Sequence, residues 1–575
     1  MSFRFPQCLR FVVFLILTTL LPTACRRNSS TGVERIAILH FDNLTGDAQW
    51  NWLSAAAPSL WRTQLSGSSS SVANVVKSPS EAAQLRATRL LTGYFSVRAG
   101  MLRGTVTVVD SESGRTQSTI LVQAGDAIGL LNQISSQLQL PVRPFPTQTL
   151  KALEAYGQGL AATSPSDFVA HLKDATTLDP SFGLAWVQLI DRMRGRGDIA
   201  GSSDIARLAL AQKSIPAVER ADIGLRALPA DASAADRLAQ LENVSRANPA
   251  EANYATQTAD FAVAARMLPK AVEWYRIATK IMPESSQLWN SKAYAEAFSG
   301  DFENAQKSMQ RYQAAAPDDA NFYDSSGEIL FMQGHFAEAA ASFQTGFQKL
   351  PNAFGANMLR KAAWAHLRSG NGTEANKVFG QYVEFRQKMN DPFIPLRQAQ
   401  WVYLTGQHAA AKLQLQSFAV EKKNPFAWAQ LSIWERFEEH PAKAVEYAQK
   451  AIQGLLGAPQ YRNSVAIAAV LAQPNAPASV WKQRMNGQPI AAIGMLVSKE
   501  PSEAAQFLEE VRSKINPLQE YYWKDLHAIA LYRSGKKAQA KALLTSYSLP
   551  EAEEDAVVLC FAFPADQQIR KELAK

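Results

Sequence analysis

Cysteine is scarce in this chain, and long apolar runs are scarce as well. Three cysteines occur among 575 residues, Cys8, Cys25 and Cys560, so we expect packing rather than disulfides to hold the fold. Cys560 lies in an apolar run and is interpreted as a small buried hydrophobic residue. Beyond the amino terminus no stretch approaches the roughly 20 apolar residues of a membrane-spanning helix. The mature protein is therefore not expected to span a bilayer.

Clustered positive charge is absent too. The net charge is +8, but lysine and arginine never form a run of five or more. Nucleic-acid binding needs a concentrated basic surface, because phosphate contacts supply most of its affinity. We therefore predict no nucleic-acid partner.

Signatures of catalysis are missing in the same way. The seven histidines are scattered without the spacing of a helical metal site, and phosphate-loop and nucleophile-elbow patterns do not occur. The glycine-rich run at 195–201 and the Ser-x-x-Lys match at 534–537 are interpreted as turns between helices, as is the segment around Glu438 and His440. His40, at the end of an expected strand, is interpreted as a structural residue. We predict no enzyme activity, no cofactor and no metal.

The amino terminus has the layout of an export signal. Two arginines precede an apolar run at 11–21, and small residues lead to Cys25. This order predicts a signal peptide over residues 1–24, followed by a lipidated tether over 25–33 that begins with Cys25. The alternatives are signal cleavage without lipidation and a signal that stays uncleaved as an anchor. Arg26 after the cysteine, instead of aspartate, favours the outer membrane over the inner one.

Proline recurs at a fixed interval in the central part of the chain. Four prolines lie 34 residues apart, at Pro249, Pro283, Pro317 and Pro351. Other residues keep the same interval, namely Ala271, Ala305 and Ala339, Gly300 and Gly334, Phe302 and Phe336, and Trp289 and Tyr323. The small-residue position can be followed further at Ala375, Ala411, Ala444, Ala504 and Ala540.

A period of 34 residues with these residue types is typical of the tetratricopeptide repeat (TPR), a pair of antiparallel helices. The proline ends the second helix, the alanine lets the two helices approach closely, and the glycine closes the turn between them. One pair cannot bury its apolar face alone, so neighbouring pairs have to stack. We predict a solenoid of about twelve helical pairs over residues 149–549, followed by a cap at 550–575.

The segment at 34–140 alternates between strand and helix patterns. Strands are expected at 35–41, 72–76, 90–97, 102–109 and 116–122, and helices at 50–65, 80–87 and 127–138. Three pieces, Ile36–Asp47, Leu91–Phe95 and Val106–Gly114, resemble the TolB-like amino-terminal domain found next to TPR arrays in many bacterial proteins. The resemblance implies a small α/β module without known catalysis. A Pro-rich linker at 141–148 follows it.

The expected fold class is therefore mainly α: a TPR α-solenoid preceded by a small α/β TolB-like domain. Within the regular repeats, polar side chains recur at matching positions of the first helices. The row comprises Asn253, Gln287, Asn290, Tyr294, Asn321, Asp324, Glu328, Asn357 and Arg360. In TPR superhelices these positions face the concave groove, where carboxamides both donate and accept hydrogen bonds. We predict a peptide groove there; the alternative is that these amides satisfy free N–H groups at helix starts or lie in water.

The sequence supports two functions. The first is a scaffold that binds a protein or peptide through the concave face of the solenoid, held by lipid on the periplasmic side of a bacterial cell envelope. The second is an accessory or regulatory subunit of an envelope enzyme or signalling complex, acting through the α/β module.

Overall fold

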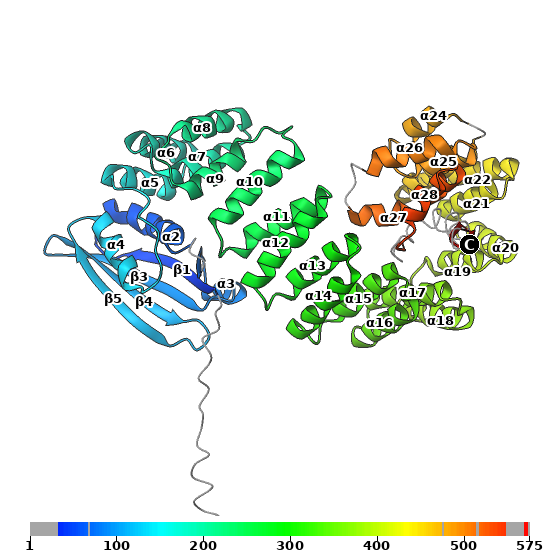
Figure 1. The fold of residues 1–575 in the computed structure, drawn as a ribbon, viewed down its shortest axis with the longest axis horizontal. Helices are drawn as coiled ribbons and strands as arrows, with labels where there is room; N and C mark the ends of the chain where they lie inside the picture. Colours follow the sequence, from blue (N-terminus) through cyan, green and yellow to red (C-terminus); the bar gives the residue numbers. More distant parts are fainter. Residues whose placement is uncertain (1–32, 67–69, 474–475, 513–516, 548–568, 573–575) are drawn as a thin grey trace, which may run out of the picture. The chain divides into compact units, whose positions relative to one another are not determined.

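The computed structural model of the protein describes residues 33–66, 70–473, 476–512, 517–547 and 569–572. The predicted signal peptide, Cys25, Cys560 and most of the predicted tether and carboxyl-terminal cap lie outside the described residues. The chain divides into two compact units, Met1–Tyr254 and Ala255–Lys575 (Figure 1). In the part of the chain that is described, no helix combines the length and the apolar character that crossing a membrane requires.

The N-terminal unit begins with a five-stranded mixed sheet. Its strand order is β2-β1-β3-β4-β5, with β1 parallel to β2 and β3, and with β3, β4 and β5 antiparallel. The elements are β1 (Glu34–Asn43), η2 (Ala48–Trp50), α2 (Asn51–Leu65), β2 (Ser71–Val75), α3 (Pro79–Gln84), β3 (Arg89–Arg98), β4 (Met101–Asp110), β5 (Thr116–Ala124) and α4 (Ala127–Gln137). Every strand and helix predicted for this segment is present, with small shifts at the ends.

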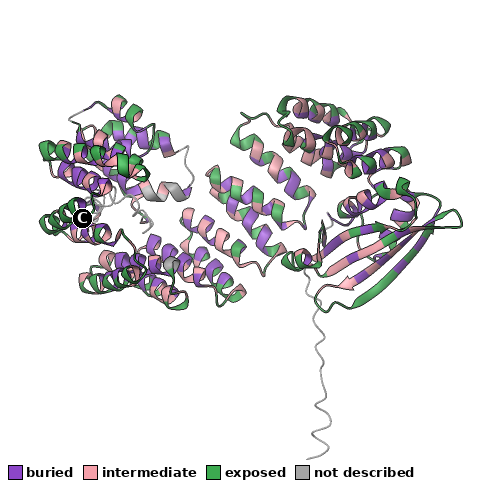
Figure 2. Ribbon diagram, turned by 180° about the vertical axis from the view of Figure 1, so that it is seen from behind, coloured by how far each residue is buried: buried purple, intermediate pink, exposed green. Residues whose placement is uncertain are grey.

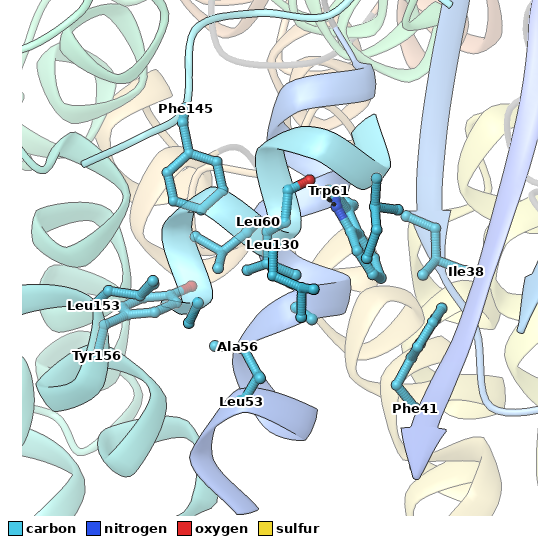
Figure 3. Close-up of a cluster of buried hydrophobic side chains, with 14 of the residues drawn as sticks. Ile38, Phe41, Leu53, Ala56, Leu60, Trp61, Leu130, Phe145, Leu153 and Tyr156 are labelled. Carbon is cyan, nitrogen blue, oxygen red and sulfur yellow. Dashed lines mark hydrogen bonds between the residues drawn. The ribbon is translucent and has the colours of Figure 1, made fainter. Parts of the chain in front are cut away.

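Aromatic residues from the sheet and from α2 form the centre of the core. The ring of Phe41 on β1 lies 4.8 Å from that of Trp61 on α2 and 5.7 Å from that of Phe95 on β3, measured between centroids. Leu130 on α4 lies beside Trp61 (Figure 3). Because α2 and α4 bury this face, the alternating pattern of the strands has one apolar side and one side that faces outward.

The same core continues into the first helical pair. Leu153 and Tyr156 of α5 (Leu150–Ala161) point toward α2 (Figure 3), and the hydroxyl groups of Tyr156 and Ser59 lie 2.9 Å apart. The predicted linker at 141–148 takes part through Phe145, which is buried. The α/β module and the first pairs therefore form a single packed body.

The helices that follow are arranged as consecutive antiparallel pairs. In the N-terminal unit these are α5, α6 (Pro165–Leu178), α7 (Gly183–Gly195), α8 (Ile199–Ala211), α9 (Ala217–Ala227) and α10 (Ala234–Ala247). Helix α11 (Ala252–Ala264) contains the boundary between the two units. The second unit continues with α12 (Leu268–Ile281), α13 (Ser286–Phe298), α14 (Phe302–Ala315), α15 (Ala320–Gln333), α16 (Phe336–Lys349), α17 (Ala353–Arg368), α18 (Gly372–Lys388), α19 (Ile394–Leu404) and α20 (His408–Glu421). It ends with α21 (Pro425–Phe437), α22 (Pro441–Gly454), η3 (Leu455–Gly457), η4 (Pro459–Tyr461), α23 (Arg462–Ala472), α24 (Ala478–Arg484), α25 (Ala491–Val497), α26 (Pro501–Arg512), α27 (Pro517–Arg533) and α28 (Lys537–Leu543).

The period of the prolines corresponds to the helix pairs. Each of the four prolines stands two residues after the end of a second helix, following α10, α12, α14 and α16. Gly300 and Gly334 have φ angles of 82° and 90°, in the left-handed region that suits the turn after a first helix. The periodic alanines are fully buried, and buried positions recur along every helix of the array (Figure 2). The predicted fold class is thus confirmed: a TPR-type α-solenoid preceded by a small α/β domain.

The C-terminal helices of the second unit return to its regular repeats. Tyr547, which follows α28, donates its main-chain N–H to the carbonyl of Met332 on α15 at 2.9 Å. Its ring meets that of Phe336 edge-on, with centroids 4.7 Å apart. Arg266 also forms an ion pair with Glu520 of α27, 254 residues further along the chain. The repeat period did not predict this closure.

Candidate functional site on the first helices of the regular repeats

The predicted polar row lies on four first helices, α11, α13, α15 and α17. Asn253 belongs to the N-terminal unit, and the other eight residues belong to the second unit. Two members are exposed, Asn253 and Gln287. Four are partly buried, Asn290, Tyr294, Asn321 and Asn357. Three are buried, Asp324, Glu328 and Arg360.

Three helices are joined by a buried charge network within this row. The ammonium of Lys361 on α17 donates to both oxygens of Asp324, at 2.8 and 2.9 Å, and to Oε1 of Glu328 at 2.6 Å. The phenol of Tyr294 on α13 donates to Oε2 of Glu328 at 2.6 Å. Burial first, and then the negative charge of Glu328, raise the pKa of Tyr294 well above its usual range, so the phenol keeps its proton. These bonds fix neighbouring first helices relative to one another.

Lys361 is the member of the network that sequence reasoning missed. The register comparison selected Arg360, and the side chain one position further along a helix points about 100° away. At the register of Lys361 the two preceding pairs carry Ser291 and Ser325. The signal in the sequence is a single lysine at a register where the two preceding repeats carry serine. The neighbouring first helix, α15, carries two acidic residues.

Asn321 is engaged at the start of its own helix. Its side-chain N–H donates to the hydroxyl of Tyr312 at 3.0 Å, and that hydroxyl donates to Oδ2 of Asp319 at 2.7 Å. The other oxygen of Asp319 caps α15 by accepting the main-chain N–H of Asn321 at 2.9 Å. The side chain of Asn321 is therefore held by Tyr312, while Asp319 and not the amide of Asn321 caps the helix.

Asn290 differs from the rest of the row. Its side-chain oxygen is buried and accepts no hydrogen bond from the described part of the chain. A buried acceptor without a donor costs about 1–3 kcal/mol, so it calls for an explanation. Gln287 lies one turn earlier on α13 and is exposed. This part of α13 therefore carries two carboxamides, of which that of Gln287 is accessible from solvent.

A group with the composition of a metal site lies at the turn between α21 and α22. Ligand atoms of Glu435, Glu438 and His440 lie within 4.8 Å of one another. The ammonium of Lys412 already lies among them, 3.0 Å from Glu435 and 2.7 Å from Glu438. Burial would raise the pKa of Glu438, but the hydrogen bonds from Lys412 and Tyr403 and the nearby positive charge together lower it. The cluster therefore works as an ion-pair network in which the chain itself supplies a cation to both glutamates.

The other motifs considered for catalysis are turns, as predicted. The hydroxyl of Ser534 donates to the carbonyl of Leu531 at 2.9 Å and so serves the end of α27. Gly197 has a φ of 83°, and the next residue, Asp198, caps α8 through an oxygen 2.8 Å from the N–H of Gly201. His40 is exposed and lies within β1, which continues to Asn43, rather than at the end of the strand as predicted.

Comparison with known proteins gives likeness of fold only. No family model and no curated protein sequence matches the chain. Among solved structures, the MamA protein aligns at 14% identity over 36% of this chain and 92% of its own, with a TM-score of 0.26. PilF of Pseudomonas aeruginosa aligns at 17% identity over 37% and 95%, with a TM-score of 0.27. YrrB, described as a TPR protein with an unusual peptide-binding site, aligns at 12% identity over 38% and 92%, with a TM-score of 0.25.

Proposed function

We propose that this protein is a non-catalytic scaffold of the bacterial cell envelope that binds a protein or peptide partner along α13, α15 and α17. The observation that carries the proposal is the buried, unsatisfied side-chain oxygen of Asn290 beside the exposed amide of Gln287. An extended peptide offers main-chain N–H and C=O groups in alternation, which two carboxamides one turn apart can accept from and donate to.

The charge network favours a partner recognised through its main chain. Lys361 donates to both Asp324 and Glu328, and the phenol of Tyr294 donates to Glu328, so both acids already have partners within the chain. The network also holds α15 and α17 in fixed positions, which lowers the ordering cost of binding. A sequence-tolerant peptide site follows from these two properties.

The site is tested by replacing Gln287 and Asn290 together by alanine. Crosslinking in intact cells with mass spectrometry identifies the partner, and the affinity of the purified pair is then measured by calorimetry. The matched control is Glu303→Ala with Lys307→Ala on α14, whose side chains are 81% and 61% exposed. We expect the affinity to fall about tenfold or more in the first variant, which corresponds to about 1.4 kcal/mol, and to stay unchanged in the control. Equal affinity of both variants would refute this site.

The membrane anchor is proposed from the position of Cys25 after the apolar run. A lipid at Cys25 would hold the chain on the periplasmic side, with the outer membrane favoured. Cys25→Ser should move the protein from the membrane fraction to the soluble fraction and abolish labelling with a fatty-acid analogue. Unchanged fractionation and an unlabelled wild type would point instead to signal cleavage without lipidation.

A second candidate function is regulatory contact through the α/β module. Tyr94 on β3 pairs with Thr105 on β4, which pairs with Leu121 on β5, so Tyr94 and Leu121 share one face of the sheet. Their side chains are 38% and 58% exposed. Because the core of the module continues into α5, deleting the module would expose that core, and Tyr94→Ser with Leu121→Ser is the cleaner test. Loss of the crosslinked partner in this variant, but not in the α13 variant, would favour the regulatory function.

A further inference from the structure

A charged cavity lies inside the N-terminal unit, where α2 of the α/β module meets the early helical pairs. Its volume is about 170 Å³, and its walls come from α2, the segment before α5, α7, α9 and the start of α11. Four carboxylates and three guanidinium groups line it, a net charge of −1 when all are ionised. Titratable groups gathered around one cavity make it a candidate ligand site.

The guanidinium group of Arg226 is occupied by hydrogen bonds to other residues of the protein. Arg226 on α9 donates to both oxygens of Asp191 on α7, at 2.6 and 2.9 Å, and to Asp222 at 2.6 Å. Burial alone would lower the pKa of Arg226, but the hydrogen bonds and charges of the two aspartates raise it. This group of three carries one excess negative charge at the wall of the cavity.

A second guanidinium is turned toward neutral groups. Arg143 donates to the carbonyl of Ala247 at 2.9 Å and to the side-chain oxygen of Asn248 at 3.4 Å. Burial lowers the pKa of Arg143, although the charges of Glu219 and Glu251 work in the opposite direction. Arg143 therefore attracts the two glutamates at a distance without forming an ion pair with them.

Glu219 lines the cavity with a carboxylate that forms no ion pair with the residues that the structure describes. The residue is 9% exposed, its side chain accepts from its own main-chain N–H, and neither it nor Glu251 forms an ion pair with any residue that the structure describes. Burial raises the pKa of both glutamates. A β-carbon at Gly183 would come 2.6 Å from the β-carbon of Glu219, so glycine is needed to seat this side chain. A buried carboxylate in this state is stabilised most by a cation beside it.

We propose that this cavity binds a small organic cation, an ammonium or guanidinium compound, whose positive group pairs with the carboxylate of Glu219 while Glu251 and Asp222 contribute their charge. The net charge of the walls and the unpaired Glu219 select a cation over an anion. Because the cavity lies between α2 and the helices α7 and α9, the bound cation would join the α/β module to the first pairs. This site is separate from the peptide site proposed on α13.

The test uses the full chain and two probes, ethylammonium chloride and methylguanidinium chloride, with sodium chloride to keep the ionic strength constant. Binding is followed by calorimetry and by the shift of the unfolding temperature, and sodium acetate serves as the anionic probe. We expect saturable binding of at least one cationic probe with a stoichiometry of one, and binding about tenfold weaker in Glu219→Gln. Asp231→Asn, an exposed acid in the turn between α9 and α10, is the matched control and should bind as the wild type does.

The stability of the unliganded variant separates a binding role from a structural one. Removing a carboxylate that burial disfavours should leave the unfolding temperature of Glu219→Gln unchanged or higher, while the shift caused by the probe disappears. Glu251→Gln serves in the same way if Glu219→Gln fails to fold. Equal binding by the wild type and both glutamine variants, binding of acetate in preference to the cations, or a cavity that takes up water only would each overturn the proposal.

Discussion

The ammonium of Lys361 on α17 lies 2.6 Å from Oε1 of Glu328 on α15, and the two side chains are only 1% and 7% exposed. An ion pair buried to this degree contributes little net stability as a pair, because both charges had to leave water. Removing one partner is a different matter, since the remaining charge stays buried. The stacking of these two repeats therefore depends on the presence of both partners.

Lys361→Met should destabilise the second unit by about 3–5 kcal/mol, because it removes the ammonium that pairs with the buried carboxylates of both Asp324 and Glu328. Denaturant unfolding followed by circular dichroism measures the change. Lys307→Met is the matched control: Lys307 also pairs with a glutamate, Glu303, but both are exposed. Its effect should stay within about 1 kcal/mol. Equal losses in the two variants would contradict the central role of the buried pair.

Gly334→Ala should destabilise the protein more than Gly300→Ala. Both glycines have positive φ, so alanine costs about 1 kcal/mol at either position. A β-carbon at Gly334 would also come 2.9 Å from the ring of Tyr547, whereas nothing lies within 4 Å at Gly300. The ring would have to leave its edge-on contact with Phe336, which adds about 0.5–1.5 kcal/mol.

The excess cost at Gly334 can be assigned to Tyr547 by a double-mutant cycle. In a Tyr547→Ala background, alanine at positions 334 and 300 should have the same effect on the unfolding temperature. Hydrogen exchange of α27 and α28 should rise in Tyr547→Ala, because the main part of the closing contact is lost. An excess that persists in this background would mean that Tyr547 does not hold the C-terminal helices against α15 and α16.

Gly157→Ala should weaken the joint between the α/β module and the helical array, although alanine is the better helix former. A β-carbon at Gly157 on α5 would lie 2.7 Å from the ring and from the main-chain oxygen of Trp52 on α2. We expect a loss of about 1–3 kcal/mol from overpacking. Gly159→Ala, two residues along the same helix with contacts no closer than 3.4 Å, should be neutral or stabilising. Thermal unfolding of the full chain distinguishes the two outcomes.

The repeats were predictable because their residues act locally. Pro283 and Gly300 each fix the backbone of a turn through their own chemistry. The spacing of such residues in the sequence therefore predicts where the helix pairs lie. No sequence pattern predicts the contact of Tyr547 with Phe336, because the two residues lie far apart in the chain and Tyr547 does not belong to the 34-residue repeat. Long-range packing of this kind becomes visible only when the superhelix brings distant turns together.

The two sites were predictable to different degrees. The row on the first helices could be found by register. The register alone could not distinguish Asn290, whose side-chain oxygen accepts no hydrogen bond from the described residues, from Asn321, whose side chain donates to Tyr312. The charged cavity could not be predicted from the sequence, because Asp191 and Arg226 belong to early helix pairs that do not follow the 34-residue period. Nor does the sequence distinguish Glu219, which the fold buries, from a surface acid.

His527 on α27 should make the second unit less stable as the pH falls. Burial lowers the pKa of His527 below 6.5, with the charge of Glu509 opposing this effect only in part. The folded state then binds fewer protons than the unfolded state, so the stabilisation is present above about pH 6.5 and is lost as the pH falls through the folded pKa. Hydrogen exchange of α27 measured from about pH 7.5 down to about pH 5 should show this loss in the wild type, after correction for the intrinsic exchange rate.

His527→Gln isolates this contribution from those of other groups. Burial also lowers the pKa of His366, which therefore acts in the same direction, while the buried Glu219 and Glu251 have raised pKa values and lie in the N-terminal unit. Because the glutamine side chain does not titrate, the stability of α27 should depend less on pH in the variant than in the wild type, and His366→Gln should flatten the remaining slope. A variant whose pH dependence equals that of the wild type would show that His527 is protonated as readily in the folded chain as in the unfolded one.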